Sequence, residues 1–377
     1  MRIGFDAKRA FCNFRGLGNY SRSLISSLVK YFPENHYHLY TPKIKEEFNY
    51  YLVHENNVSR HFPAGFPFQQ IHPLWRSFKM ADDIRSQNID LFHGLSHEIP
   101  KGLAGQKIRT VVTIHDLMYI HFPQFFPWID RVVYDQKIKY ACKNADSVIA
   151  ICEQTKNDLI EFYKLSPEKV TVQYQSIDER YFVDQKQVYK LPEGVERKGY
   201  ILGVGAFVAN KNFESLIQAF GRMHKFLPQD LVLVGFGSNQ KRQEYNDIAK
   251  ELGCEGRVHY LTDVSAEELP SVYKRASLFV LPSFHEGFGL PIIEAMSQGC
   301  PVVTTGGGAH QESAGDCAVF IDPNSVENLS EGMLQVLENK EKNQVLSQSG
   351  KERAQFFHPK IISQQLFRHY EIVTSKR

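Results

Sequence analysis

The sequence predicts an α/β protein with parallel sheets, and two observations support that prediction. Short runs rich in β-branched and aromatic residues alternate, along most of the chain, with segments whose apolar residues recur at helical spacing. The alternation starts again near Gly199, after a polar stretch that is punctuated by proline and glycine. With 377 residues, the chain is long enough for two domains that each bury a core.

The first half alternates from its first residues onward. Strands are expected at residues 2–6, 36–40, 89–92, 110–114, 147–151 and 170–174. Helices are expected at about 19–31, 129–143 and 154–163, and "LSPEK" predicts a turn before the last of these strands.

The second half repeats the pattern. Strands are expected at residues 200–204, 231–234, 258–260, 278–281, 301–304 and 319–321, with helices between them. Each half therefore has the alternation of a Rossmann-like domain, and the two domains are expected to face a central cleft. The predicted boundaries are 1–180 for the first domain, 181–199 for a linker, 200–356 for the second domain and 357–377 for a helix that packs back on the first.

Composition narrows the class of protein. Lys plus Arg number 44 against 42 Asp plus Glu, so nothing in the charge indicates a nucleic-acid partner. No apolar run approaches the roughly 18 residues of a membrane span, and the N-terminus lacks the apolar stretch of a signal peptide. The six cysteines show no C-x-x-C pair. We therefore expect a cytoplasmic protein with reduced thiols, whose oligomeric state the sequence does not specify.

The stretch "SFHEGFGLPIIEAMSQG", residues 283–299, places carboxylates beside bare backbone. It follows the predicted strand "SLFVLPS", and open parallel sheets bind ligands beyond the carboxyl ends of their strands. Pro291 suits the first turn of a helix that Gly299 would close. Gly287 and Gly289 lie at the start of that helix, where free N–H groups and the helix dipole favour an anion such as a diphosphate.

Two glutamates flank this predicted phosphate cradle. Glu286 precedes it, and Glu294 lies about one turn into the helix. A carboxylate accepts paired hydrogen bonds from vicinal hydroxyls, so the pair suggests a ligand with sugars on both sides of its phosphates, which is a nucleotide sugar. By spacing alone, such glutamates are more often solvated surface charges, and it is "GFGLP" after a β-run that favours binding.

These segments resemble the retaining glycosyltransferases of family 4, which have the GT-B fold of two Rossmann-like domains. The resemblance covers nearly the whole chain and rests on "GLGNYSRSL", "VVTIHDL", "VGAFVANKN", "LVLVGFG", "EELPSVYKRASLFVLPSFHEGFGLP" and "PVVTTGGGAHQESAGDCAVFIDP". The stretch "VVTIHDLMYIHFPQFFP" is similar to stretches in bacterial polysaccharide mannosyltransferases. This similarity favours GDP-mannose as the donor, with a UDP-sugar as the alternative.

The resemblance implies a role for each residue of the site. Glu286 would bind a hydroxyl of the transferred sugar, Glu294 the ribose and Lys211 the diphosphate. His115 would reach the donor sugar from the first domain. Further donor contacts are implied at Gly16, Gly18, Val264, Gly287, Phe288, Gly289 and Leu290. The first two glycines also fit a turn before a helix, because the G-x-G-x-x-G pattern stops at Ser21.

The chain departs from the family pattern at the diphosphate. Many members carry an arginine near the lysine, and the corresponding positions here are Ala206 and Asn210. Lys211 then acts with helix N–H groups alone, or a cation comes from the facing domain. The candidates for that cation are Lys8, Arg9 and Arg15.

The chemistry that the resemblance implies is transfer of a hexosyl unit, with retention, from a nucleoside diphosphate sugar to a hydroxyl of a glycan or lipid-linked oligosaccharide. It implies no cofactor and no bound metal, because N–H groups and Lys211 can stabilise the leaving diphosphate. His93 and His97 have i, i+4 spacing, but they lie at a strand end, so we expect no metal pair there. The run "WRSFKM" is typical of a half-buried helix face, and contact with the acceptor or with the inner face of the cell membrane is the alternative.

Three other classes share some of these features. A GT-B nucleotide-sugar epimerase would consume the donor without an acceptor. A nicotinamide oxidoreductase would need a complete dinucleotide fingerprint, which "GLGNYS" does not supply. A two-lobed sugar-binding protein without catalysis is the non-enzyme alternative, although such proteins are usually exported and this sequence shows no signal peptide.

Overall fold

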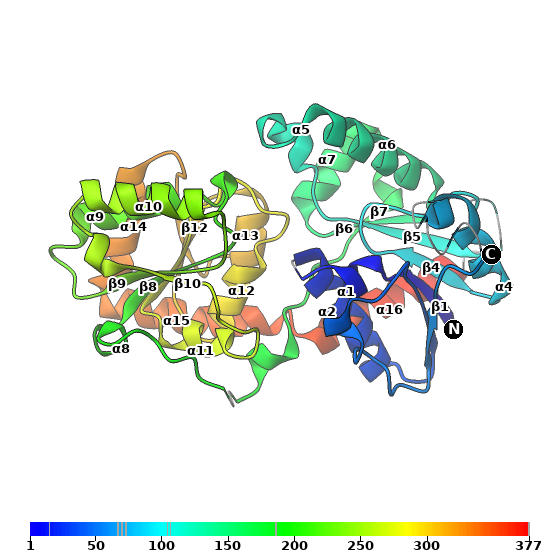
Figure 1. The fold of residues 1–377 in the computed structure, drawn as a ribbon, viewed down its shortest axis with the longest axis horizontal. Coiled ribbons are helices and arrows are strands. Elements are labelled where there is room, and N and C mark those ends of the chain that lie inside the picture. The colour runs from blue at the N-terminus through cyan, green and yellow to red at the C-terminus, as the bar shows by residue number, and fades with distance from the viewer. Residues whose placement is uncertain are drawn as a thin grey trace. The chain divides into compact units, whose positions relative to one another are not determined.

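The computed structural model describes the chain except for residues 15, 66–67, 69–70, 72–73, 104, 106, 185–186 and 376–377 and the side chains of Ser77 and Phe78. It divides into unit 1, which is Met1–Ser176 with Pro359–Arg377, and unit 2, which is Ile177–His358. Each unit has one parallel sheet with helices on its faces (Figure 1). The predicted class, α/β with two Rossmann-like domains, is confirmed.

Unit 1 contains a seven-stranded sheet in the order β3-β2-β1-β4-β5-β6-β7. Its strands are β1 (Arg2–Asp6), β2 (His36–Tyr40), β3 (Val58–His61), β4 (Leu91–Gly94), β5 (Arg109–Ile114), β6 (Ser147–Ala150) and β7 (Val170–Val172). The order reverses between β1 and β4, so the connections that follow these two neighbours diverge and leave a crevice. The edge strand β3 was not predicted, because "VSRH" has a single apolar residue and no alternation.

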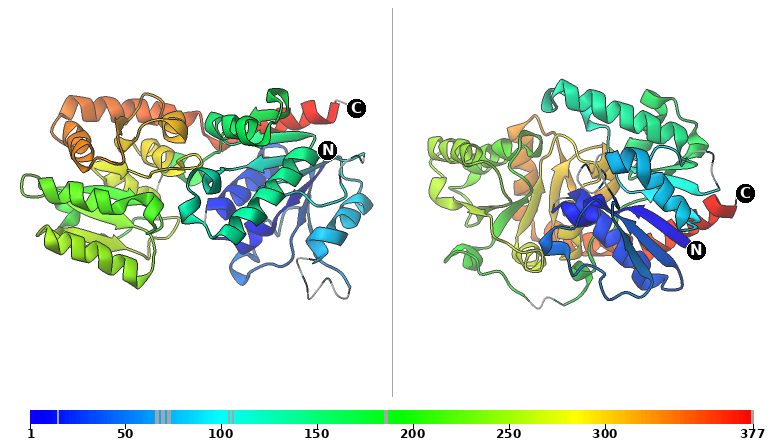
Figure 2. Two further views of the ribbon diagram at one scale, coloured as in Figure 1. Left: turned by 90° about the horizontal axis from the view of Figure 1, so that it is seen from above. Right: turned by 45° about the vertical axis from the view of Figure 1, so that its right-hand side comes forward.

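The helices of unit 1 are α1 (Lys8–Cys12), α2 (Gly16–Tyr31), α4 (Met80–Ser86), α5 (Met118–His121), α6 (Trp128–Asn144), α7 (Glu153–Tyr163) and α16 (Pro359–Ser375). Alternate strand residues face opposite layers, as a pleated sheet requires. Val111 packs with α2 and α16, whereas its neighbour Val112 packs with α6. The last helix, red in Figure 2, contacts α2 and thus joins the two ends of the chain in one unit.

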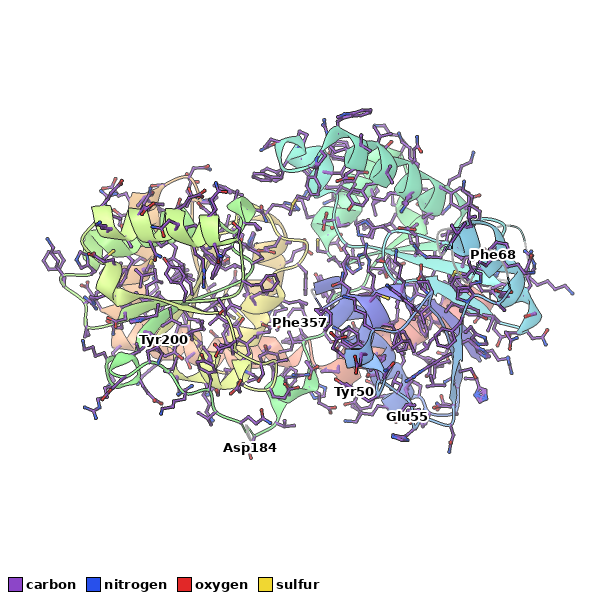
Figure 3. All side chains as sticks on the ribbon, viewed as in Figure 1. Tyr50, Glu55, Phe68, Asp184, Tyr200 and Phe357 are labelled. Carbon is purple, nitrogen blue, oxygen red and sulfur yellow. The ribbon has the colours of Figure 1, made fainter. Side chains whose placement is uncertain are left out.

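Unit 2 contains a six-stranded sheet in the order β10-β9-β8-β11-β12-β13. The strands are β8 (Tyr200–Val204), β9 (Asp230–Val234), β10 (Val258–Leu261), β11 (Leu278–Leu281), β12 (Val302–Thr305) and β13 (Val319–Ile321). Tyr200, labelled in Figure 3, is fully buried at the start of β8. Here the strand order reverses between β8 and β11.

The helices of unit 2 are α8 (Val195–Lys198), α9 (Phe213–Met223), α10 (Asn239–Glu251), α11 (Leu269–Arg275), α12 (Leu290–Ser297), α13 (Gly308–Ala314), α14 (Val326–Leu337) and α15 (Lys340–Gln355). In Figure 1, α9, α10 and α14 cover one face of the sheet, and α11 and α15 lie on the other. The two units also contain 3-10 turns at Glu46–Phe48, Pro123–Phe125, Pro167–Lys169, Glu179–Phe182, Ala209–Lys211 and Glu255–Arg257, and a π-helical turn at Trp75–Lys79.

The segment expected as a linker, residues 181–199, packs on unit 2. The Gln298 side chain donates to the backbone carbonyl of Tyr181 at 2.7 Å, and Arg275 donates to the carbonyl of Tyr189 at 2.7 Å. The units accordingly divide after residues 176 and 358, whereas the sequence placed boundaries at 180 and 356. Polar, proline-containing composition predicted a free linker because it does not reveal these side-chain contacts.

Two further findings concern the cysteines and the possibility of a membrane-spanning helix. All six cysteines are free thiols. Within the described residues, no helix combines the length and the apolar character that crossing a bilayer requires.

Candidate active site

The candidate donor site lies in unit 2, where the strand order reverses. The connection after β8 passes through the 3-10 turn Ala209–Lys211 into α9, and the connection after β11 runs from Pro282 into α12. Because β8 and β11 are paired neighbours in a parallel sheet, both connections leave the same edge of the sheet. Open parallel sheets bind their ligands at this kind of position.

Two asparagines join these connections. The Asn210 side chain donates from Nδ2 to the backbone carbonyl of His285 at 2.8 Å. The backbone carbonyl of Asn210 accepts from the N–H of Phe284 at 3.0 Å. Asn212, in the left-handed region with φ 56°, donates from Nδ2 to the carbonyl of Pro282 at 3.1 Å. In the sequence, Asn210 marked only the place of a missing arginine. In the structure it holds the connection after β11 in position.

Lys211 and Glu286, which were predicted to bind diphosphate and sugar, lie in contact. Lys211 Nζ is 2.5 Å from Glu286 Oε1, and the two side chains are only 17% and 13% exposed. The lysine stem runs over Gly205, where a Cβ would lie 3.2 Å from the lysine Cε. Burial disfavours the ionised form of Glu286, but the charge of Lys211, joined at acidic pH by that of a protonated His310, holds its pKa below the usual value. Glu286 is therefore a carboxylate at neutral pH.

His310 and Ser283 complete the surroundings of Glu286, and the sequence did not single them out. His310 is 4% exposed, and burial lowers its pKa to about 4, so the ring is neutral at pH 7. Among the described residues, His310 Nε2 has no hydrogen-bond partner, whereas the Ser283 hydroxyl bonds to the Glu286 carboxylate. Buried polar atoms are normally paired. An unpaired nitrogen beside Glu286 therefore suits a ligand that brings hydroxyl or phosphate oxygens.

The backbone between Glu286 and α12 has the conformation expected of a phosphate cradle. Gly289 precedes the helix with φ 86°, a left-handed conformation that glycine adopts without strain. Phe288 is buried, and its ring centroid lies 5.5 Å from that of Phe357, which is labelled in Figure 3. In the first turn, Pro291 has no N–H and the Ile292 N–H donates to the Gly289 carbonyl at 2.9 Å, which leaves the N–H of Leu290 for a ligand at the positive end of the helix dipole. Gly287 lies in the same stretch.

Glu294 lies one turn into α12 beside two tyrosines. Its Oε2 accepts from the Tyr273 hydroxyl at 2.9 Å, and the Tyr181 hydroxyl also bonds to the carboxyl group. Burial raises the pKa of Glu294 to about 7, although both hydrogen bonds act in the opposite direction. The predicted ribose-binding carboxylate is thus partly protonated near neutral pH. The tyrosines come from α11 and from the segment expected as a linker, so the motif gave no sign of them.

We expect Glu294→Gln to stabilise the protein above neutral pH. The raised pKa means that the folded state holds the proton more tightly than the unfolded chain does. The carboxyl group therefore contributes stability below its unfolded pKa and loses it as pH rises through about 7. A neutral amide avoids that loss, so the free energy of unfolding at pH 8 should rise by about 1–3 kcal/mol, and by less at pH 5. Urea unfolding at both pH values measures this, and an equal change at both would contradict it.

His115 lies in unit 1, directly after β5, and is 4% exposed. Its Nε2 donates to the carbonyl of Leu95 at 2.9 Å, and its Nδ1 accepts from the Gln175 amide at 2.9 Å. These two bonds fix the tautomer and engage both ring nitrogens. Burial lowers the pKa of His115 to about 3, with the neighbouring His97 acting in the same direction. The ring is therefore neutral.

The surroundings of His115 contain two groups that the sequence did not single out for this role. The His97 ring stacks on the His115 ring with centroids 5.4 Å apart. His97 Nε2 also accepts from the backbone N–H of His115 at 3.1 Å. His97 has φ 63°, a strained left-handed conformation of the kind that clusters at functional sites. The Tyr20 ring meets His115 edge-on at 4.7 Å. His93 is engaged elsewhere, since its ring nitrogens contact Tyr370 and Thr113.

The other predicted donor contacts are distributed over both units. In unit 1, α2 begins at Gly16, and a Cβ on Gly18 would lie 1.8 Å from the carbonyl oxygen of Asn13, so close packing alone requires that glycine. In unit 2, Val264 follows β10 and is half-buried. Among the alternative cations, Arg15 lies outside the described residues.

Two Rossmann-like units in one chain, one of them with a lysine, a carboxylate and a glycine-led helix start at its strand reversal, define the class of GT-B glycosyltransferases. Comparison with known families agrees with that class. Residues 14–181 match the family described as Glycosyltransferase Family 4, and residues 186–353 match the family described as Glycosyl transferases group 1. The chain belongs to the glycosyltransferases that these two families describe.

Individual relatives give the same result. The O-antigen chain mannosyltransferase B of Escherichia coli is 28% identical over 324 residues, which are 81% of this chain and 79% of that protein. Sucrose-phosphate synthase from Thermosynechococcus elongatus has a TM-score of 0.77 at 19% identity and covers 100% of both chains. HepE of Anabaena, in complex with UDP-glucose, has a TM-score of 0.74 at 20% identity over 98% of this chain and 99% of that one. The GT-B fold is confirmed.

Proposed function

We propose that this glycosyltransferase is a retaining, metal-independent hexosyltransferase that moves mannose from GDP-mannose to a hydroxyl of a glycan or lipid-linked acceptor. The contact between Lys211 and Glu286 at the strand reversal of unit 2 carries the proposal, because it sets a cation for a diphosphate beside an acceptor of sugar hydroxyls. The 28% identity to an O-antigen chain mannosyltransferase supports mannose. A UDP-sugar is the alternative donor, since HepE was solved with UDP-glucose.

In the proposed reaction, the bond between the anomeric carbon and the diphosphate oxygen breaks, and the acceptor oxygen bonds to the same face of that carbon. The acceptor proton passes to the leaving phosphate oxygen, so no separate base is required. Lys211 and the Leu290 N–H at the positive end of α12 stabilise the negative charge that develops on this oxygen. Glu286 stays ionised and orients the transferred sugar by accepting from its hydroxyls.

A lipid-linked acceptor would bring the enzyme to the inner face of the cell membrane as a peripheral protein. The run 75–80, in which we expected a half-buried helix face, contains the π-helical turn Trp75–Lys79. Trp75 is fully buried there, and its Nε1 donates to Asp83 at 2.7 Å. The tryptophan therefore packs inside unit 1 and offers nothing to a membrane.

A panel of GDP-, UDP- and ADP-sugars, incubated without acceptor, tests this proposal. We expect slow release of nucleoside diphosphate from GDP-mannose above all, at a rate that a metal chelator leaves unchanged. The matched control is Lys211→Ala, which should release much less. Conversion of the donor to an epimer would identify an epimerase instead, and no turnover of any donor would contradict the proposal.

A further inference from the structure

Unit 1 contains a cavity of about 650 Å³, lined by both charged and apolar side chains, at its own strand reversal. Asp6 ends β1 and Lys8 follows it, whereas Glu98 and Lys101 follow β4. The remaining charged wall comes from Arg76, on the π-helical turn before α4, and from α6. The cavity therefore occupies, in unit 1, the position that the candidate donor site occupies in unit 2.

Positive charge predominates in this cavity. Four basic side chains and two carboxylates line it, and the basic ones are Lys8, Arg76, Lys101 and Lys137. Arg76 pairs with Asp6 and lies 3.3 Å from Glu98, and Lys137 lies 2.9 Å from Glu98. Although burial acts in the opposite direction, the two carboxylates hold the pKa of Arg76 above its usual value. The two positive and the two negative charges of these ion pairs therefore neutralise one another, and the ion pairs hold this wall of the cavity in place.

The other two basic side chains, Lys8 and Lys101, take no part in these ion pairs. Neither forms an ion pair with a carboxylate in the part of the chain that the structure describes. Lys8 is half-buried, and burial, followed by the nearby charge of Arg76, lowers its pKa. Its ammonium group thus lies where a positive charge is disfavoured until an anion arrives. An anionic ligand would stabilise the charge of Lys8 and could pair with the exposed Lys101 as well.

The backbone of Arg76 supplies an independent sign of a binding site. The residue lies on a single π-helical turn, Trp75–Lys79, that leads into α4. Such turns are rare and occur frequently at functional sites. Within the described residues, the buried Nε of Arg76 has no hydrogen-bond partner, although buried polar atoms are normally paired.

We propose that this cavity binds a phosphate group of the acceptor, so that the acceptor substrate is a phosphate-bearing sugar. The inference rests on the proposed glycosyl transfer and adds the chemical class of its acceptor. A phosphate monoester carries close to two negative charges at neutral pH, which matches the two lysines outside the ion pairs, whereas a neutral sugar would leave the half-buried Lys8 without a counter-charge. Asp6 and Glu98 lie beside them and can accept from the sugar hydroxyls.

The same phosphate chemistry occurs on a soluble sugar phosphate and on a lipid headgroup. The face of α6 that lines the cavity with Val133 and Gln136 continues toward the start of the helix with Ile129 and Val132, which are 57% and 44% exposed. Residues three and four apart share a helix face. An apolar surface thus adjoins the phosphate position, and the experiment needs one arm for each source.

The test compares Lys8→Ala/Lys101→Ala with Lys107→Ala, an exposed lysine of unit 1 that does not line the cavity. The soluble probes are mannose 6-phosphate and mannose, titrated calorimetrically into the full chain without donor. The lipid probes are phosphatidylcholine vesicles with and without phosphatidic acid, assayed by sedimentation.

We expect the double variant to bind the phosphate-bearing probe at least about tenfold more weakly, because two charged contacts are lost. Lys107→Ala should bind it as the parent does. A response to mannose 6-phosphate assigns the phosphate to a soluble sugar, and a response to phosphatidic acid vesicles alone assigns it to a lipid.

Equal affinity of the double variant and the parent would overturn the inference, as would binding of mannose as tight as that of mannose 6-phosphate. Thermal unfolding of each variant identifies a loss that comes from misfolding, and the charge-conserving Lys8→Arg variant should retain binding. Because no donor is present, the result can be interpreted whether or not the nucleotide-sugar panel shows turnover.

Discussion

Replacing Lys211 with alanine should lower turnover of the nucleotide sugar by about 10²-fold or more. The ammonium group lies at the edge of the sheet where the diphosphate is proposed to leave, and charge on the leaving oxygen is larger in the transition state than in the bound donor. Single-turnover measurement at saturating donor isolates this step from binding. A Lys211→Ala variant that turns over at nearly the parent rate would remove the lysine from the diphosphate site.

The contact with Glu286 complicates this variant and supplies its control. Lys211→Ala leaves a buried carboxylate without its partner, which destabilises a protein by roughly 3–5 kcal/mol when a buried pair is broken. The double variant Lys211→Ala/Glu286→Gln removes both charges and should regain much of that stability. Because Glu286 is itself proposed to orient the sugar, the double variant should be folded and inactive. Recovery of turnover together with stability would mean that the pair serves only the fold.

Replacing each of the two glutamates with alanine should affect the nucleoside diphosphate and the complete donor differently. Glu294→Ala should weaken both the nucleoside diphosphate and the complete donor by about 1.5–3 kcal/mol, the value of a hydrogen bond to a charged group. Glu286→Ala should spare the nucleoside diphosphate and reduce turnover of the complete donor, because it is proposed to bind the sugar. This asymmetry follows from their positions, one before the helix start and one a turn inside α12.

Calorimetric titration of each variant with GDP and with GDP-mannose measures this division. In the parent, GDP affinity should also fall as pH drops below about 7, where the raised pKa of Glu294 leaves the carboxyl group protonated and less able to accept from ribose. Glu294→Ala should lose this pH dependence, and Glu286→Ala should keep it. Identical losses of GDP affinity in the two variants would refute the division.

Much of the fold could be predicted because buried parallel strands are apolar along their whole length. All the strands expected in the second half are present, each within one residue at either end. Elements whose conformation depends on tertiary contacts were not predicted. The edge strand β3 has little apolar character, and the π-helical turn Trp75–Lys79 shows no periodicity of its own.

The residues of the candidate site likewise include some that could be predicted from the sequence and some that could not. Lys211 and Glu286 could be found because each follows a strand beside a glycine-containing turn, and the structure brings them together. His310 was missed because it belongs to a different connection, the one after β12, and meets Glu286 only in the folded sheet. Tyr181 was missed for the opposite reason, since a polar composition concealed the packing of its segment on unit 2.

The asparagines on either side of Lys211 have a kinetic consequence. Through Asn210 and Asn212, the connections after β8 and β11 are bonded to each other at three points. If the nucleotide binds there as proposed, it should meet groups already in place and lose little conformational entropy. Donors that differ only in base or sugar should then associate at similar rates and differ mainly in how long each complex lasts.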